Sequence, residues 1–178
     1  FLKFDVSAQT WDSDITDTPD APATIYGGGS LLKYGTYLYS LRGNGRPEFW
    51  RYDITNSEWN SISTPSNMGN AYEGNLMVYV TNAESGCDDT DGCLYISPGE
   101  NTTTFWRYDI NDHVWTVLDT LPGGLRYGSS ICYDGSGTIY ANRANNLLNF
   151  YSYSISGNAW STLTSMPATH STGTAGSL

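Results

Sequence analysis

The residues best suited to chemistry lie in one acidic stretch, Cys87-Asp88-Asp89-Thr90-Asp91-Gly92-Cys93. The carboxylates of Asp88, Asp89 and Asp91 repel one another unless a cation or solvent lies between them. Hard oxygen ligands of this kind suit Ca²⁺, although the downstream bidentate Glu of an EF-hand loop is absent at the required offset. The stretch therefore predicts either a calcium site at these three residues or a solvated acidic loop tip.

The cysteines frame this stretch. A disulfide between Cys87 and Cys93 would close a small loop and imply an oxidising compartment. The alternative is a pair of free thiols at the two ends of a hairpin. Cys132 is distant, and we expect it to be a buried, unpaired small hydrophobe. Asn101 begins an Asn-Thr-Thr glycosylation sequon, which matters only in a secreted protein.

Residues for catalysis are few. His113 and His170 are the two histidines, and neither has a partnered nucleophile or metal-ligand spacing. The sequence contains no glycine-rich phosphate loop and no nucleophile elbow. A carboxylate pair for glycoside hydrolysis stays an open alternative, because the sequence does not give the distance between carboxylates.

Internal repeats organise the whole chain. The hexapeptide Phe-Trp-Arg-Tyr-Asp-Ile at residues 49–54 recurs unchanged at 105–110, and looser copies begin at Phe1 and Phe150. The starts lie 48, 56 and 45 residues apart. A tryptophan lies ten residues after each leading Phe, at Trp11, Trp59, Trp115 and Trp160. A proline then ends each unit, at Pro19, Pro65, Pro122 and Pro167.

Each unit divides into four strand-like segments. In the second unit, strands are predicted at 30–34, 37–42 and 49–54 and around Trp59, with a turn at Gly35-Thr36 and a loop over 43–48. Alternating apolar and polar residues and many aromatic residues favour strands. No segment carries a sustained helical stripe, so no long helix is expected.

A period near 50 residues with four strands resembles the kelch repeat, which forms one blade of a β-propeller. The matching features are the apolar first strand, Tyr39 or Tyr140 in the second, the Tyr52-Asp53 and Tyr108-Asp109 pairs, and the spaced tryptophans. The usual double glycine after strand two is absent. The resemblance implies an all-β propeller of four-stranded antiparallel kelch-like blades. It is closer to a secreted prokaryotic-style variant than to an intracellular ubiquitin-ligase adaptor.

The repeats predict about three complete blades and part of a fourth. The predicted units are a partial blade at 1–22, repeats at 23–68, 69–123 and 124–167, and the start of the next blade at 168–178. The repeat at 69–123 carries a hairpin insertion at 81–92. An open arc exposes aromatic faces and strand edges. We therefore expect a larger ring of about six to eight blades, completed by more chain or by other subunits.

Side chains on both faces of a blade pack against neighbouring blades. We expect the tryptophans to pack between blades, and Asp53 to accept backbone N–H bonds in a turn. The 2–3 loops and the crossings between units lie on one face of the disc, where sugar or peptide could bind; ordinary solvated loops are the alternative. The candidate binding residues there are Asn44, Arg46, Glu48, Tyr72, Glu73, Arg126 and Tyr127. The same loops carry Glu100, Asn101, Asn145 and Asn146.

Composition narrows the function. The net charge is −10 and the pI is near 4.3, which disfavours nucleic acid and anionic membrane surfaces as partners. No run approaches the roughly 18 apolar residues that a membrane span needs. We expect a non-enzymatic extracellular or cell-surface propeller for protein interaction or assembly, with a protein, a polysaccharide or itself as partner. The alternative is a carbohydrate-active or oxidase-type enzyme with further site residues outside this segment.

The cysteine arrangement makes a prediction for mass spectrometry. A non-reduced proteolytic digest should contain Cys87 linked to Cys93, with Cys132 as a free thiol. A linkage between Cys93 and Cys132, or three free thiols, would contradict it.

Overall fold

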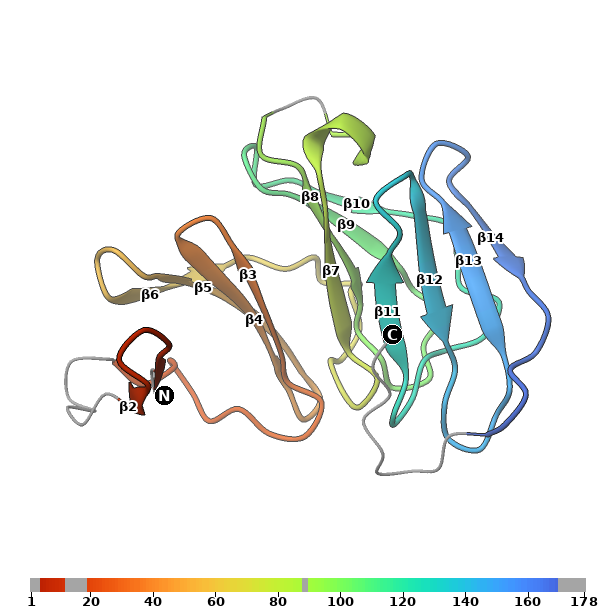
Figure 1. The fold of residues 1–178 in the computed structure, drawn as a ribbon, viewed down its shortest axis with the longest axis horizontal. Coiled ribbons are helices and arrows are strands. Elements are labelled where there is room, and N and C mark those ends of the chain that lie inside the picture. The colour runs from red at the N-terminus through yellow and green to blue at the C-terminus, as the bar shows by residue number, and fades with distance from the viewer. Residues whose placement is uncertain (1–3, 12–18, 88–89, 170–178) are drawn as a thin grey trace.

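The chain is all-β. The computed structural model describes residues 4–11, 19–87 and 90–169. They form three four-stranded antiparallel sheets and one two-stranded sheet (Figure 1). The helix within these ranges is a single 3-10 turn, Asn82–Glu84. Within the described residues, no helix is both long enough and apolar enough to cross a membrane.

Each sheet corresponds to one repeat, and we number the sheets as blades. Blade 1 contains β1 (Phe4–Asp5) and β2 (Thr10–Trp11). Blade 2 contains β3 (Ser30–Tyr34), β4 (Tyr37–Gly43), β5 (Arg46–Asp53) and β6 (Glu58–Ile62). Blade 3 contains β7 (Leu76–Val80), β8 (Cys93–Ser97), β9 (Trp106–Asp109) and β10 (Trp115–Val117). Blade 4 contains β11 (Ser130–Tyr133), β12 (Thr138–Asn142), β13 (Phe150–Ser154) and β14 (Ala159–Thr162).

Strands within blades 2 to 4 pair in chain order, each antiparallel to the next. The first strands of successive blades contact each other, β3 with β7 and β7 with β11. The blades therefore stand side by side through their first strands, as Figure 1 shows. This arrangement places the 2–3 loops and the crossings at one end of the strands, and the 1–2 and 3–4 turns at the other.

One predicted loop is wrong. Residues 43–48 do not form a loop, because β4 runs to Gly43 and β5 starts at Arg46. A two-residue turn of Asn44 and Gly45 joins the strands, with φ of 55° and 73°. Both residues suit a turn that needs two left-handed positions. Arg46 and Glu48 therefore lie on a strand instead of a loop.

Aspartates stabilise the turns between strands three and four. The Asp53 Oδ1 accepts hydrogen bonds from the backbone N–H groups of Thr55 (2.8 Å) and Asn56 (3.1 Å). Asp109 and Asp5 accept the same pattern of bonds in their own turns. The N–H of Asn56 contributes most to holding the pKa of Asp53 below its usual value. The predicted structural role of Asp53 is confirmed.

The repeated tryptophans occupy equivalent positions on strand four. Each lies across the ladder from an aromatic residue of strand three, in the pairs Phe4–Trp11, Tyr52–Trp59, Tyr108–Trp115 and Tyr153–Trp160. The ring centroids of these pairs lie 5.1, 5.1, 4.7 and 5.1 Å apart, respectively. The matching geometry confirms that the four units are copies of one structural pattern.

The same tryptophans connect blades. The Trp115 ring lies 5.3 Å from Phe49 of blade 2, and its indole N–H donates to the Ser63 carbonyl at 2.8 Å. The Trp160 ring lies 5.0 Å from Phe105 of blade 3. Each of these side chains therefore reaches back to the preceding blade. The prediction that the tryptophans pack between blades is confirmed for Trp115 and Trp160, whereas Trp11 is 63% exposed.

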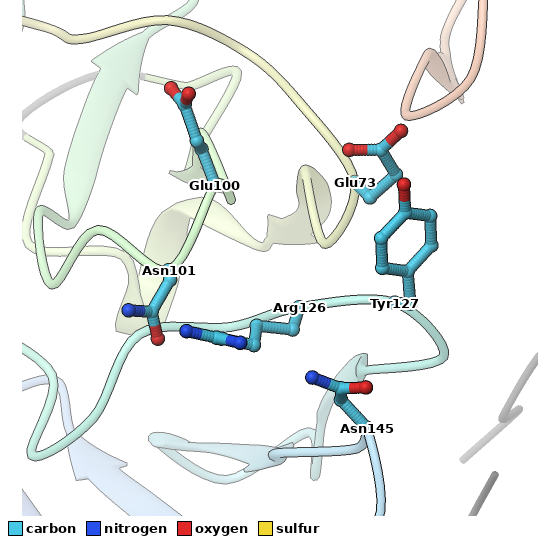
Figure 2. Close-up of a pocket in the computed structure, with 6 residues that line it drawn as sticks. All are labelled: Glu73, Glu100, Asn101, Arg126, Tyr127 and Asn145. Atoms are coloured by element: carbon cyan, nitrogen blue, oxygen red, sulfur yellow. The ribbon is translucent and has the colours of Figure 1, made fainter. Parts of the chain in front are cut away.

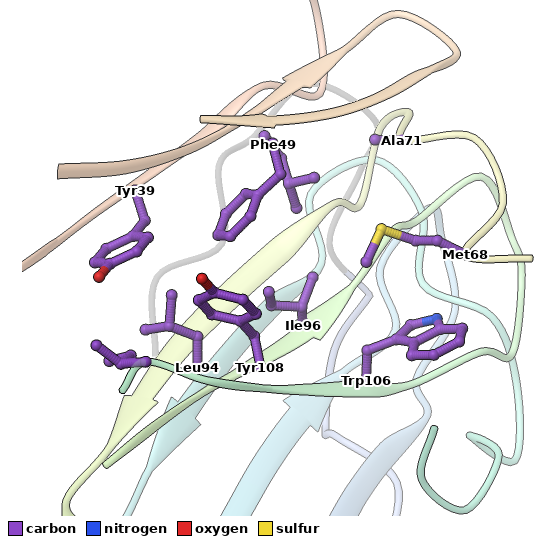
Figure 3. Packing of buried hydrophobic residues seen from close by; sticks show 10 residues of the cluster. Tyr39, Phe49, Met68, Ala71, Leu94, Ile96, Trp106 and Tyr108 are labelled. Atoms are coloured by element: carbon purple, nitrogen blue, oxygen red, sulfur yellow. The ribbon is translucent and has the colours of Figure 1, made fainter. Parts of the chain in front are cut away.

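The core between blades 2 and 3 is largely aromatic. Tyr39 and Phe49 of blade 2 face Leu94, Ile96 and Tyr108 of blade 3, and all five side chains are buried (Figure 3). The rings of Phe49 and Tyr108 meet edge-to-face at 5.5 Å, a favoured arrangement of aromatic pairs. This core holds the two blades in a defined register.

The insertion in blade 3 is closed by a disulfide. Cys87 and Cys93 are bonded, with their Cα atoms 6.5 Å apart. Cys132 is free but only half-buried, so the prediction of a buried thiol is wrong. It lies in β11, which contacts β7, and the described residues contain no further blade to cover its other side.

Glycines in the crossings allow the blades to approach closely. Gly28, Gly74 and Gly128 precede the first strands of blades 2, 3 and 4, with φ of 80°, 84° and 75°. A Cβ at Gly74 would lie 2.6 Å from the backbone N of Arg126, which belongs to the next crossing. A side chain therefore fits there only if the neighbouring backbone moves.

This contact predicts the effect of two matched substitutions. Gly135 has a φ of 78° but no atom within 4 Å of a Cβ, so Gly135→Ala should cost only left-handed strain, about 1 to 2 kcal/mol. Gly74→Ala adds a backbone clash, and should lower the free energy of unfolding by about 3 kcal/mol or more. Urea denaturation followed by tryptophan fluorescence measures both. Equal losses would show that the crossings do not pack as described.

Candidate functional site

A pocket of about 320 Å³ lies on the crossing side of blades 3 and 4. We call it the crossing pocket, and Figure 2 shows the residues that line it. Glu73 comes from the crossing before β7, and Arg126 and Tyr127 come from the crossing before β11. Glu100 and Asn101 come from the loop between β8 and β9, and Asn145 from the loop between β12 and β13.

Backbone hydrogen bonds fix the β8–β9 loop against both crossings. The Glu100 N–H donates to the Glu73 carbonyl at 3.1 Å, and the Asn101 N–H donates to the Leu125 carbonyl at 2.9 Å. Glu100 and Asn101 are both left-handed, with φ of 53° and 59°. Asn tolerates this conformation, whereas Glu adopts it at a cost. The loop is therefore held in an unfavourable conformation by its contacts with two crossings.

Two arginines lie at the wall of the crossing pocket between the β8–β9 loop and blade 4. The Arg143 guanidinium donates to Asn101 Oδ1 and to the Gly124 carbonyl, both at 2.9 Å. The Arg126 side chain is half-buried, and its Nε is buried with no hydrogen-bond partner among the described residues. Arg126 thus brings a guanidinium with unused donor capacity to the pocket.

A tyrosine and a carboxylate form the opposite wall. Tyr127 is 50% exposed, and Figure 2 shows its hydroxyl directed at Glu73. The hydrogen bond to Glu73 is the main cause that raises the pKa of Tyr127, because it favours the protonated phenol. The ring leaves one apolar surface open to solvent beside several hydrogen-bonding groups.

The pocket combines donors, acceptors and an aromatic ring. Two carboxylates, one guanidinium, two amides and a phenol converge on a volume that suits a small polar group. Polar groups around an aromatic ring are the usual features of a site that orients a ligand by hydrogen bonds. The arrangement is suited to a hydroxyl-rich or amide-rich ligand.

Three of the seven predicted binding residues line this pocket: Glu73, Arg126 and Tyr127. The other four lie outside it. Glu48 forms an ion pair with Arg42 at 2.9 Å, and Arg46 is exposed on β5. Asn44 belongs to the β4–β5 turn, and the Tyr72 ring covers Gly45 so closely that a Cβ there would lie 2.7 Å from it.

Three lining residues were placed on the correct face but not among the candidates. Glu100, Asn101 and Asn145 lie in the predicted 2–3 loops. The sequence indicated the two asparagines, because Asn101 and the Asn145-Asn146 pair are residues that suit the left-handed positions of a tight loop. Glu100 had no such signal in the sequence.

The sequon residue is exposed and lines the pocket. Glycosylation of Asn101 stays a prediction. A glycan on this side chain would lie at the pocket, so glycosylation and ligand binding there would compete.

The calcium prediction falls partly outside the described residues, because it includes Asp88 and Asp89. Asp91 is described, and its Oδ1 accepts a hydrogen bond from the Tyr34 hydroxyl at 3.2 Å. Cys87, Cys93 and Asp109 gather their potential ligand atoms within 4.8 Å. Both sulfurs are in the disulfide, so that cluster has no thiolate to offer a metal.

The histidines were not expected to form a catalytic group. His113 lies in the turn before β10, where its Nδ1 and the Tyr108 hydroxyl share a hydrogen bond of 2.9 Å. This contact ties His113 to the blade core. His170 lies outside the described residues.

Comparisons with known proteins address the fold. No protein-family model and no curated protein sequence matches the chain. Among solved structures, the chain is similar to YjhT, a kelch-repeat β-propeller protein, with a TM-score of 0.55 and 14% sequence identity. The match covers 85% of this chain and 54% of YjhT, so the chain spans about half the length of that protein. The four-stranded sheets and this match show a kelch-type β-propeller fold.

The contact between Tyr127 and Glu73 predicts a titration result. Glu73→Gln removes the negative charge that favours the protonated phenol, so the pKa of Tyr127 should fall towards its ordinary value. NMR titration of ¹³C-labelled tyrosine measures this pKa. Glu100→Gln is the matched control and should change it less. An unchanged pKa in Glu73→Gln would contradict the contact.

Proposed function

We propose that this chain is a non-enzymatic interaction module of an extracellular or cell-surface protein, with the crossing pocket as a contact site for a saccharide. The observation that carries the proposal is the convergence of Glu73, Arg126 and Tyr127 with two loop asparagines in one pocket. Sugar hydroxyls both donate and accept hydrogen bonds, and a sugar ring can pack on an exposed aromatic face. The pocket offers partners for each of these contacts.

Charge supports a neutral saccharide over an acidic one. The pocket holds two carboxylates, Glu73 and Glu100, against one guanidinium, and the whole chain carries −10. An anionic ligand would meet net repulsion at this site. A neutral sugar avoids that cost and still accepts hydrogen bonds from Arg126.

An extracellular setting is supported by independent features. The Cys87–Cys93 disulfide is of the kind that persists in oxidising compartments. The sequon at Asn101 is exposed, and the acidic, aromatic-rich composition suits a secreted propeller. Protein partners and assembly with further copies are compatible with the same setting.

One observation favours an enzyme as the second candidate. Glu73 and Glu100 are two carboxylates in a single pocket, and most glycoside hydrolases act through a pair of carboxylates. A hydrolase would release reducing ends from the same sugars that a binding module only retains. Glu100→Gln would then abolish the release.

Isothermal titration with neutral hexasaccharides of glucose, galactose, mannose and xylose tests the proposal. At least one should bind, and Tyr127→Ala should weaken binding about tenfold, equivalent to about 1.4 kcal/mol. Tyr26→Ala is the matched control, because Tyr26 is 51% exposed in the corresponding part of the crossing before blade 2 and does not line the pocket. Its binding should be unchanged.

Three outcomes would contradict the proposal. No binding across the panel would overturn the saccharide assignment, and equal binding by Tyr127→Ala would remove the crossing pocket from it. Release of reducing sugar, lost in Glu100→Gln, would replace the binding module with the enzyme.

A further inference from the structure

Two equivalent clefts flank blade 3 at the end of the strands opposite the crossing pocket. Tyr39 pairs with Arg51 across the ladder of β4 and β5, and Tyr95 pairs with Arg107 across β8 and β9. Tyr39 and Arg51 therefore hold the same positions in blade 2 that Tyr95 and Arg107 hold in blade 3. Each tyrosine packs in the aromatic core toward the next blade.

In blade 3, the insertion supplies hydrogen-bond acceptors for Tyr95 and Arg107. The Tyr95 hydroxyl donates to the Ser85 carbonyl, and the Arg107 Nη1 donates to the Gly86 carbonyl at 2.8 Å. Two consecutive main-chain carbonyls thus bind the two side chains. The insertion brings its own backbone to these two donors, and a pocket of about 620 Å³ remains between the insertion and the turns of blade 4.

The same pair in blade 2 has no such partner. There the 1–2 turn is only Gly35-Thr36, which lines the cleft but is too short to lay its backbone over the two side chains. The Tyr39 side chain is 0% exposed, and its hydroxyl lies beside the Arg51 guanidinium but has no acceptor for its own proton among the described residues. The buried Nε of Arg51 also has none, and its guanidinium lies over the Tyr37 ring at 4.3 Å. Buried donors without partners are rare in native proteins and need an explanation.

A cavity of about 450 Å³ opens at these donors. Its walls include Tyr34, Tyr37 and His113 besides the two donor residues. Asp91 also lines it, so its carboxylate opposes the single positive charge of Arg51. The charges balance, which favours a neutral ligand over a carboxylate or a cation.

We propose that this cleft binds a neutral main-chain segment of a protein partner. Two consecutive carbonyls of the segment accept hydrogen bonds from the Tyr39 hydroxyl and from Arg51, as Ser85 and Gly86 do for their equivalents in blade 3. The tyrosine rings around the donors supply amphipathic contact area, which protein interfaces favour. This site lies opposite the crossing pocket and does not depend on the saccharide proposal.

The test uses the uncharged peptide N-acetyl-Asn-Ala-Gln-Ser-Gly-amide, which has the sequence of residues 82–86 with Gln in place of Glu84. Added to the protein at millimolar concentration, it should cause saturable NMR shifts in the amides of Gly35, Thr36 and Asn111, which line the cleft. Arg51→Gln should weaken binding at least tenfold. Arg46→Gln is the matched control, because it removes the same charge from an exposed site at the other end of β5, and should not change binding.

Tyr39→Phe provides a second variant that keeps the core filled. It should weaken peptide binding several-fold and leave the melting temperature unchanged or higher, because it removes a buried hydroxyl without a partner. Tyr95→Phe should lower the melting temperature, since its hydroxyl is bonded to Ser85. Equal effects of the two substitutions on the melting temperature would overturn the premise that the Tyr95 hydroxyl has an acceptor and the Tyr39 hydroxyl has none.

The remaining outcomes decide the proposal itself. No saturable shift, shifts confined to the crossing pocket, or equal weakening by Arg46→Gln would each overturn it. Tyr127→Ala should leave peptide binding intact, so failure of the saccharide proposal is distinguishable from failure of this one.

Discussion

The contact of Trp115 and Trp160 with the preceding blade is the constraint on which this structure depends. A blade of four short strands cannot bury both of its faces alone. Trp115 covers Phe49 and Trp160 covers Phe105, so successive blades share one aromatic layer. The Trp115 N–H also bonds the Ser63 carbonyl, which fixes the tryptophan along the strand direction. Packing and one directional bond together set the register between blades 2 and 3.

The crossing pocket follows from that register. Its lining comes from two crossings and two loops, each attached to a different strand end. The Glu100 N–H and the Asn101 N–H reach the two crossings only because blades 3 and 4 are held at the right separation. The Gly74 turn permits the approach, because a side chain there would meet the Arg126 backbone. Blade packing, crossing contact and pocket shape are therefore one connected arrangement.

Differences between the repeats carry the features that suggest function. Blades 2 and 3 share the same strand-three sequence, yet the insertion exists only in blade 3. Its backbone occupies one cleft, and the equivalent cleft beside blade 2 keeps Tyr39 and Arg51 without those carbonyl partners. The disulfide between Cys87 and Cys93 ties the middle of the insertion to the start of β8 and limits its freedom. Blades 2 and 3 thus share the same strand positions but present different surfaces at their 1–2 turns.

The sequence by itself determined the repeat period, the strands, the role of Asp53 and the positions of the four tryptophans. These follow from local pattern and spacing, which the chain carries without knowledge of its neighbours. It also placed the loops and crossings on one face, because antiparallel strands alternate in direction.

Only the tertiary structure decided which of those loop residues meet. Arg126 and Tyr127 converge with Glu73, whereas Glu48 is held by Arg42 and Arg46 extends a strand. The sequence also could not predict that the Tyr39 hydroxyl lacks an acceptor, since its sequence environment resembles that of Tyr95, whose hydroxyl has one. Such outcomes depend on contacts between residues about 25 to 55 positions apart, such as Glu73 with Tyr127 and Asn101 with Leu125. Their geometry is set by the packing of whole blades, which no local pattern of side chains encodes.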